Sequence, residues 1–298
     1  MTNLSESSSG LVHGRILLIS AAIMWSTSGL FLKSPLMEEL PLDSRGPVVA
    51  CYRALFAAAV LIPFVRFGSI RWKPALVPMT ILFAVMNLLF VTAMTRTTAA
   101  ATIFLQYTST AWAFLFGLLF LKERVERGNL VALAFSLCGI VWIVAGDWGG
   151  ENFTGNLLAL GSGFCYAGVV LSLRVLRDED SAWLVTLNNL IGGLVLLPWA
   201  FSADISLRSE QWLLVALLGA FQLGVPYVLF ARGIRSIRIQ EAALLSLMEP
   251  VLNPVWVLFV WKRSPEPTTW IGGALILTGL AVRYLLFPSR EPSQRETV

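Results

Sequence analysis

Residues 75–94 read ALVPMTILFAVMNLLFVTAM (Ala75–Met94), twenty residues without a charged side chain. A helix rises about 1.5 Å per residue and the hydrocarbon core of a bilayer is about 30 Å thick, so a run of this length is typical of a membrane-spanning helix. The run has no polar stripe of the kind that a helix on a soluble domain turns to water. In lipid the backbone must satisfy its own hydrogen bonds, which a helix does within one segment. The stretch therefore predicts a membrane protein.

Comparable apolar runs fill the chain on both sides of this stretch. Together with it, four runs make a first set of five: Arg15–Leu32, Val48–Arg66, Thr98–Leu121 and Gly128–Gly146. A second set of five follows: Gly155–Val175, Ala182–Phe201, Glu210–Phe230, Ile239–Trp261 and Thr268–Phe287. Prolines and glycines separate many of these runs, as turn residues do. The expected fold class is an all-α membrane protein with ten transmembrane helices.

The composition agrees with this fold class. Hydrophobic residues make up 56% of the chain, charged residues 13%, and the mean hydropathy is +0.73. The net charge of +4 does not indicate a nucleic-acid partner, because the Lys and Arg residues lie in short loops between spans, where they set the topology. No segment has the pattern of a separate soluble domain.

The distribution of Lys and Arg predicts the orientation. If the N-terminus lies in the cytoplasm, 15 basic residues fall on the cytoplasmic side and 7 on the other. Cytoplasmic loops of membrane proteins carry an excess of Lys and Arg. We therefore expect a multi-pass protein of the plasma or inner membrane with both termini in the cytoplasm.

The two sets of runs resemble each other, with Gly139 and Gly279 at an offset of 140 residues and Glu126 and Glu266 at the same offset. This similarity indicates a duplication. Five crossings is an odd number, so the second repeat must enter the membrane from the opposite side. We expect two inverted five-helix repeats, residues 15–146 and 155–287. Secondary transporters often have this architecture, with a substrate site at the midplane between the repeats.

The chain also contains motifs that resemble a known family. They are WSTSG (Trp25–Gly29), Arg53 at the beginning of the second span, the stretch Thr95–Val125 and its counterpart ending in LSLMEPVLNPVWV (Leu245–Val257). Their order and repetition resemble the drug/metabolite transporter superfamily, and within it the ten-span proteins with paired EamA domains. The resemblance implies a transporter, most similar to exporters of amino acids and other small metabolites. The turn WKRSPEP departs from the family pattern, which has Glu directly after the helix.

Glu249 is the carboxylate that the spans place deepest in the membrane. Helical spacing puts Ser246, Glu249 and Asn253 on one face, and Pro250 and Pro254 each remove a helical hydrogen bond. Charged groups in a span are costly and usually functional, and broken helices line cavities in transporters. We expect Glu249 to bind the amino group of a substrate, to take up a proton during transport, or both. The alternative is a structural partner for an arginine such as Arg53.

Neutral polar and aromatic side chains within other spans are candidates for the same cavity. Interhelical hydrogen bonding is the competing interpretation for the amides and hydroxyls. The candidates are Asn87, Thr102, Gln106, Tyr107 and Asn189, with Trp25, Tyr166 and Tyr227 as an aromatic wall.

The sequence gives no indication of catalysis. His13 is the single histidine, the three cysteines lie in different spans, and no glycine-rich phosphate loop is present, so we expect no enzyme, no cofactor and no metal site. The expected partners are the lipid bilayer, a small neutral or zwitterionic substrate such as an amino acid, and possible protons, with the protein a monomer or weak homodimer. Two alternatives stay open: a non-transporting membrane scaffold, and a carrier of nucleotide-sugars or other phosphorylated metabolites. The second would need Lys or Arg at the midplane, and the predicted spans place none there.

Overall fold

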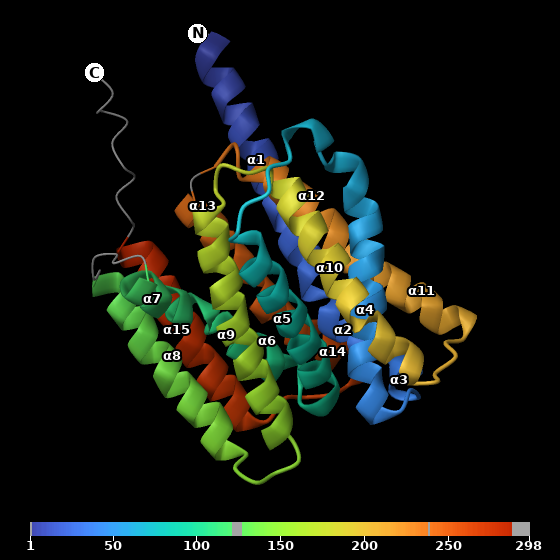
Figure 1. Ribbon diagram of the computed structural model, residues 1–298. Helices are drawn as coiled ribbons and strands as arrows, with labels where there is room; N and C mark the ends of the chain where they lie inside the picture. Colours follow the sequence, from blue (N-terminus) through green and yellow to red (C-terminus); the bar gives the residue numbers. More distant parts are fainter. Residues whose placement is uncertain (1, 121–126, 238, 288–298) are drawn as a thin grey trace.

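The computed structural model describes residues 2–120, 127–237 and 239–287 (Figure 1). These residues form helices and connecting turns, without a β-strand. Ten segments are long and apolar enough to cross a membrane. This confirms the predicted fold class, and these ten segments are numbered here as spans 1 to 10 in chain order.

The first repeat runs through eight helices. They are α1 (Thr2–Ser26), α2 (Ser28–Leu32), α3 (Pro35–Glu38), α4 (Leu42–Leu61), α5 (Leu76–Arg96), α6 (Ala99–Tyr107), α7 (Ser109–Phe120) and α8 (Arg127–Gly146). The second repeat comprises α9 (Phe153–Val175), α10 (Ser181–Ser202), α11 (Ser209–Leu217), a π-helical segment (Leu218–Gly224), α12 (Val225–Gly233), α13 (Ile239–Ser246), α14 (Met248–Trp261) and α15 (Pro267–Leu286). Spans 1, 4, 8 and 9 are each assembled from more than one of these helices.

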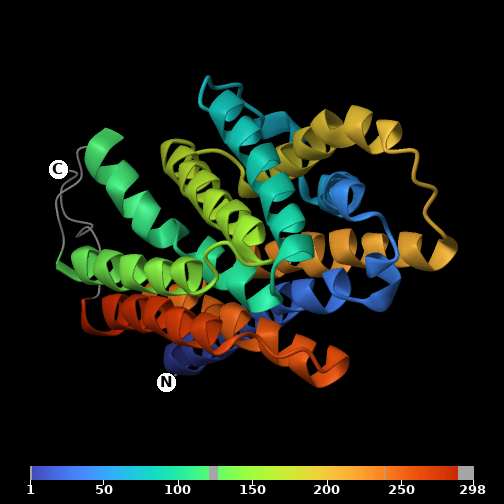
Figure 2. The ribbon, with the colours of Figure 1, turned by 90° about the horizontal axis from the view of Figure 1, so that it is seen from below.

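The contacts between the repeats follow a two-fold pattern. Span 1 (α1) packs on span 8 (α12), and span 3 (α5) packs on span 6 (α9), which is the same contact with the repeats exchanged. Span 2 (α4) packs on span 7 (α10), span 4 (α6) on span 9 (α14), and span 5 (α8) on span 10 (α15). Figure 2 shows α8 and α15 side by side along one edge of the molecule. Each span thus meets the counterpart that a two-fold axis between inverted repeats requires.

Two spans are interrupted at corresponding places. Span 4 breaks at Thr108, between α6 and α7, and span 9 breaks at Leu247, between α13 and α14. The two breaks are 139 residues apart (247 − 108), close to the repeat offset in the sequence. At the first break the Thr108 hydroxyl donates to the Leu105 carbonyl at 2.6 Å, and at the second the Ser246 hydroxyl donates to the Ala242 carbonyl at 2.9 Å. Such bonds bend helices, because the hydroxyl competes with the backbone for the carbonyl.

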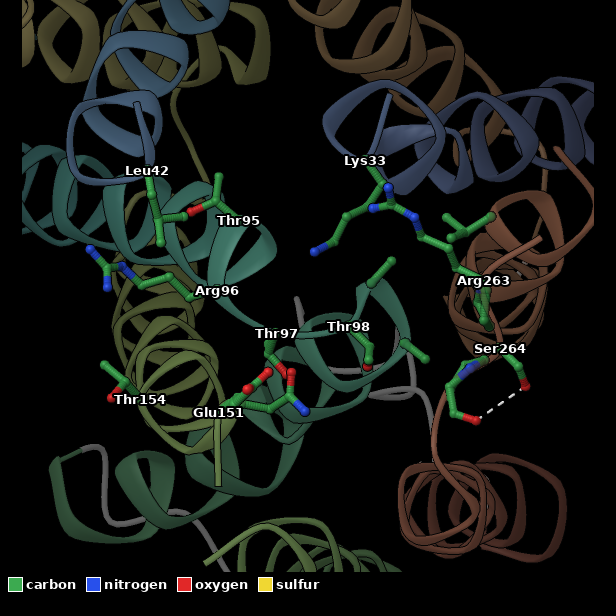
Figure 3. Close-up of a pocket in the computed structure, with 16 residues that line it drawn as sticks. Lys33, Leu42, Thr95, Arg96, Thr97, Thr98, Glu151, Thr154, Arg263 and Ser264 are labelled. Atoms are coloured by element: carbon green, nitrogen blue, oxygen red, sulfur yellow. Dashed lines mark hydrogen bonds between the residues drawn. The ribbon is translucent and has the colours of Figure 1, made fainter. Parts of the chain in front are cut away.

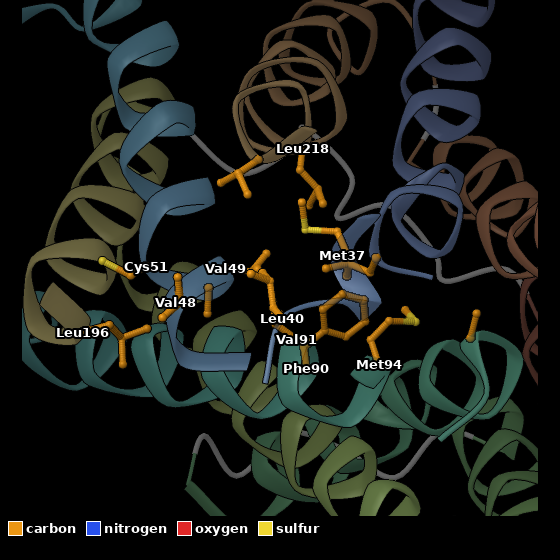
Figure 4. Packing of buried hydrophobic residues seen from close by; sticks show 14 of the residues in the cluster. Met37, Leu40, Val48, Val49, Cys51, Phe90, Val91, Met94, Leu196 and Leu218 are labelled. Carbon is orange, nitrogen blue, oxygen red and sulfur yellow. The ribbon is translucent and has the colours of Figure 1, made fainter. Parts of the chain in front are cut away.

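A large apolar cluster joins α2, α3, α4 and α5 to the second repeat (Figure 4). Met37, Val49 and Met94 are fully buried there beside Leu218. The cluster fixes α4 against α5, and α4 begins at Leu42 rather than at Val48 as the sequence predicts. Pro47 was expected to precede the helix, but it lies inside it. A proline removes one backbone donor, and a helix that is held by tertiary packing tolerates this loss.

Because ten is an even number, α1 begins and α15 ends on the same side of the molecule, as Figure 1 shows. This side is called the open face below, and the opposite side, which carries α3 and the connection between α14 and α15, is called the closed face.

Candidate functional site

A cavity of about 950 Å³ lies between the repeats. Its walls come from nine of the ten spans; span 5 (α8) contributes no lining residue. The residues nearest the entrance belong to loops and helix ends of the open face, among them Arg66, Arg177 and Arg235. A cavity of this size can hold a small metabolite.

Seven of the eleven side chains predicted for a substrate cavity line this one. They come from five different spans, so the polar residues converge. They are Trp25, Gln106, Tyr107, Tyr166, Tyr227, Ser246 and Glu249.

Glu249 and Tyr107 meet at the break in span 9. The Tyr107 hydroxyl lies 2.9 Å from Oε2 of Glu249 and 2.9 Å from the Ser246 carbonyl. Pro250 has no N–H to offer this carbonyl, so the tyrosine replaces the missing backbone donor. A hydroxyl has one proton and can donate to only one of the two acceptors at a time. The hydroxyl therefore donates either to the carboxylate or to the carbonyl.

Aromatic rings form the wall beside these groups. Trp25 packs on Tyr227 and on Phe230, in each case with ring centroids 5.3 Å apart. Gln222, which sequence reasoning missed, donates to the Trp25 carbonyl at 3.1 Å and also lines the cavity. An electron-rich wall of this kind suits a cationic ammonium group.

Four predicted residues lie outside the cavity. Asn87 holds Arg53, Thr102 donates to the Thr98 carbonyl at 3.0 Å, and Asn189 donates to the Val185 carbonyl at 2.9 Å. Asn253 donates to the Ser28 hydroxyl at 2.8 Å, near the closed face. These groups bond to helix backbones or neighbouring helices, which is the alternative that the sequence left open.

Arg53 lies deeper in its helix than the sequence predicts. It was expected at the beginning of the second span, but it is the twelfth of the twenty residues of α4. It is 4% exposed and contributes to the cavity wall. Its hydrogen bonds go to Asn87 and not to Glu249, so it is no structural partner of that carboxylate. The signal was present in the sequence but was masked by Pro47, which suggested a later helix start.

The closed face is sealed by contacts between the repeats. Within the membrane, Trp256 donates to the Ser26 hydroxyl at 2.8 Å and Trp261 donates to the Leu30 carbonyl at 2.9 Å. Outside the spans, Glu38 pairs with Arg263 and Glu39 pairs with Arg208. Gly29 allows the close approach of α2 to α14, because a Cβ there would lie 2.4 Å from Oδ1 of Asn253. The site is thus open to one side of the membrane only.

A smaller pocket of about 400 Å³ lies on the closed face (Figure 3). Lys33 and Arg263 lie on one side of it, and Thr95 and Arg96 on the other. Burial lowers the pKa of the Lys33 ammonium to about 8, although the Glu38 carboxylate acts in the opposite direction. The bond from Arg263 lowers the pKa of Glu38.

No group of three or more His, Cys, Asp or Glu side chains with the geometry of a metal site occurs in the described part of the chain. The side chains that line the cavity offer ionic, hydrogen-bonding and aromatic groups.

Comparison with known proteins connects this architecture to a family. The model of the EamA-like transporter family matches twice, over residues 12–145 and 153–285. The chain belongs to the EamA-like transporter family. The two matches fall on the two inverted repeats, and the family is one of transporters.

Individual relatives agree. An uncharacterized transporter of Archaeoglobus fulgidus is 26% identical over 273 residues, which is 91% of this chain and 96% of the relative. The uncharacterized transporter YojE of Bacillus subtilis is 24% identical and covers 87% of this chain and 88% of its own length. A solved crystal structure with 18% identity superposes with a TM-score of 0.67 over 95% of this chain and 99% of that one, which supports the fold. These two relatives are therefore similar to the chain over most of its length.

Proposed function

We propose that this EamA-like protein is a secondary transporter of small zwitterionic or neutral metabolites, with amino acids as the first choice, and that it works by alternating access. The single observation that carries the proposal is the cavity of about 950 Å³ between the repeats, open at one face and sealed at the other. A transporter that works by alternating access has a cavity of this kind when it is open to one side of the membrane and closed to the other. With both termini in the cytoplasm, the state is open to the cytoplasm, which suits a substrate that is loaded inside and exported across the inner membrane.

The side chains in the cavity support a substrate with an amino group. Glu249 supplies a carboxylate, and Trp25 and Tyr227 supply aromatic faces in the same cavity. A carboxylate and a ring face together attract an ammonium group. The neutral donors and acceptors of Gln106 and Ser246 add hydrogen-bonding capacity for a polar molecule.

Protons are the proposed coupling ion. When Glu249 is charged, Tyr107 donates to it and leaves the Ser246 carbonyl without this donor. When Glu249 is protonated it can donate to Tyr107, which then donates to Ser246 and stabilises the break in span 9. Protonation of Glu249 thus changes the hydrogen bonding of the Ser246 carbonyl at the break in span 9. This change links protonation directly to the shape of the cavity.

The two alternatives are less well supported. A scaffold predicts that polar residues do not converge, whereas seven of the predicted residues line one cavity. A carrier of phosphorylated metabolites needs several basic groups for a doubly charged phosphate. Among the arginines that line the cavity, Arg53 lies in the middle of its span, and the others lie in loops or at a helix end of the open face: Arg66, Arg177, Arg232 and Arg235. A single guanidinium within the span matches a single carboxylate better. Function as a monomer, or at most a weak homodimer, fits a site built within one chain.

Counterflow tests the proposal. Proteoliposomes loaded with a mixture of unlabelled amino acids are diluted into radiolabelled amino acids one at a time, and protein-free liposomes serve as the control. We expect at least one labelled amino acid to accumulate above the control. Exchange of hexose phosphates or nucleotide-sugars without amino-acid counterflow would contradict the proposal. The orientation has its own test, because a C-terminal alkaline phosphatase fusion should be inactive in a bacterial host.

A further inference from the structure

Arg53 is a charged residue in the middle of a membrane span without an acidic partner. Its Nε and Nη2 groups both donate to Oδ1 of Asn87, at 2.9 and 2.6 Å, and its guanidinium lies 5.4 Å from the centroid of the Phe90 ring. No carboxylate among the described residues lies within ion-pair distance of it. Asn87 and Phe90 are both uncharged, so the positive charge is not neutralised.

A buried charge of this kind is costly, and the cost is removed only by an opposite charge with good hydrogen-bond geometry. A guanidinium has five N–H donors, and the two bonds to Asn87 use two of them. The other three are not bonded to described residues, and Arg53 forms part of the wall of the cavity. An arginine with unused donors on an open cavity is well suited to hold a planar carboxylate through two parallel bonds.

Asn87 acts as the positioning residue for Arg53. It lies in α5, is fully buried, and donates through Nδ2 to the Ala50 carbonyl of α4 at 2.9 Å. This bond fixes the amide so that its oxygen faces the arginine. The guanidinium is therefore held in one direction before any ligand arrives, and this saves the ligand the entropy of ordering a long side chain.

Glu249 supplies the complementary charge in the same cavity. Its hydrogen-bond partner is the neutral Tyr107 hydroxyl, so Glu249 and Arg53 do not neutralise each other. Each leaves a place for an opposite charge, and a zwitterion carries both. Resting on the proposed function, we propose that Arg53 is the carboxylate-binding residue of the transporter and that Glu249 binds the ammonium group of the same substrate.

The assignment names the substrate class more narrowly, as compounds that carry one carboxylate and one amine. The competing interpretation is that Arg53 and Asn87 only join α4 to α5. The two differ in one measurable property, because a carboxylate site distinguishes an amino acid from its decarboxylated amine, and a structural bond does not.

The experiment measures competition against labelled amino-acid binding to the purified full-length protein. The competitors are L-leucine, isoamylamine, which lacks the carboxylate, and isocaproate, which lacks the amine. L-phenylalanine, phenethylamine and hydrocinnamate form a second series. For the parent protein we expect the amino acid to bind better than either partial compound. In Arg53→Gln the amino acid should lose about ten- to hundredfold in affinity, as expected for a hydrogen bond to a charged group, while the amine keeps its affinity.

Two further variants make the result interpretable. Arg45→Gln removes another buried arginine from the same helix, one that donates to the Leu40 carbonyl at the closed face and does not line the cavity, and it should leave the discrimination unchanged. Asn87→Asp keeps Arg53 but gives it an internal carboxylate, which should compete with the substrate and weaken amino-acid binding without weakening amine binding. The Asn87→Asp variant also tests the assignment of Arg53 if Arg53→Gln does not fold.

The outcomes distinguish a failure of the Arg53 assignment from a failure of the proposed function. If the parent protein distinguishes amino acid from amine and Arg53→Gln and Asn87→Asp do so equally well, the assignment of Arg53 is wrong and the proposed function stands. If none of the labelled amino acids binds to the parent protein, the proposed function is overturned and the assignment of Arg53 with it.

Discussion

At the scale of single residues, Glu249 is the group on which the proposed coupling depends. Glu249→Gln keeps the size of the side chain and its bond to Tyr107 but removes the titration. We expect the variant to fold and to lose the pH dependence of transport, since it cannot exchange a proton. Initial rates in proteoliposomes at several pH values measure this. Glu241→Gln is the matched control, because Glu241 pairs with Arg15 at the open face. If Glu249→Gln transports at the parent rate at every pH, Glu249 has only a structural role.

Lys33 has a different pH dependence. Its pKa in the folded protein is about 8, below the value of about 10.4 for an unperturbed lysine. The unfolded chain therefore binds more protons between these values, so stability should rise as the pH increases from about 8 to about 10.4. Below pH 8 the folded protein bears the full desolvation penalty of the charged ammonium.

Lys33→Met tests this sign. The variant should have a higher unfolding temperature in detergent at pH 7.5 than the parent protein, and the difference should shrink as the pH approaches 10. Comparing the two proteins at each pH cancels the titration of other groups. A constant difference between the two unfolding temperatures would show that burial does not perturb Lys33.

At the scale of elements, the break in span 9 is the feature that the sequence predicts most clearly. Pro250→Ala restores an N–H that can bond to the Ser246 carbonyl, in place of the Tyr107 hydroxyl. We expect the folded state to gain about 0.5–1.5 kcal/mol from this bond and transport to slow, because the span bends less easily. Thermal unfolding measures the change in stability, and the counterflow rate measures the change in transport. Pro198→Ala, at an exposed helical proline of α10, is the control and should leave transport unchanged.

How far each element can be predicted depends on which signal dominates. The ten spans are predictable, because an uncharged run of about twenty residues has few other solutions in lipid. The break in span 9 follows from Pro250, but the break in span 4 contains no proline and depends on Thr108, whose back-bonded hydroxyl is one of many in the chain. The start of α4 was missed because packing against α5 outweighs the loss of one bond at Pro47.

The same reasoning explains the prediction of the site. Aromatic and acidic residues such as Tyr107, Tyr227 and Glu249 line the cavity, because few positions in a bundle can hold them without a polar surrounding. Asn189 and Asn253 lie outside it, because a buried amide finds partners on neighbouring helices as easily as in a cavity. Their role as binding residues stays a prediction. Spacing along one helix cannot separate these two environments.

At the scale of the whole molecule, the closed face is held by ion pairs that join the repeats. Glu38→Gln with Glu39→Gln removes the partners of Arg263 and Arg208. Exposed pairs contribute about 0.2–1 kcal/mol each, so the double variant should open this face more often without unfolding. With Cys51, Cys138 and Cys165 replaced by alanine, Thr98→Cys in the closed-face pocket reports access of a membrane-impermeant maleimide. Faster labelling is the expected result, and unchanged labelling would show that the membrane-embedded contacts alone seal this face.

The helix breaks at Thr108 and Leu247 also bear on how the protein fits its bilayer. Both lie in the interior of their spans, whereas α8 and α15, packed side by side at the edge of the molecule, are continuous. Rearrangement at two internal joints need not alter the height of that continuous edge, so adjacent lipids need not stretch or compress in each cycle. Transport rates in vesicles of sixteen-, eighteen- and twenty-carbon phosphatidylcholines should then be similar, and a steep optimum at one chain length would contradict this. A carrier built in this way can work in membranes of different thickness.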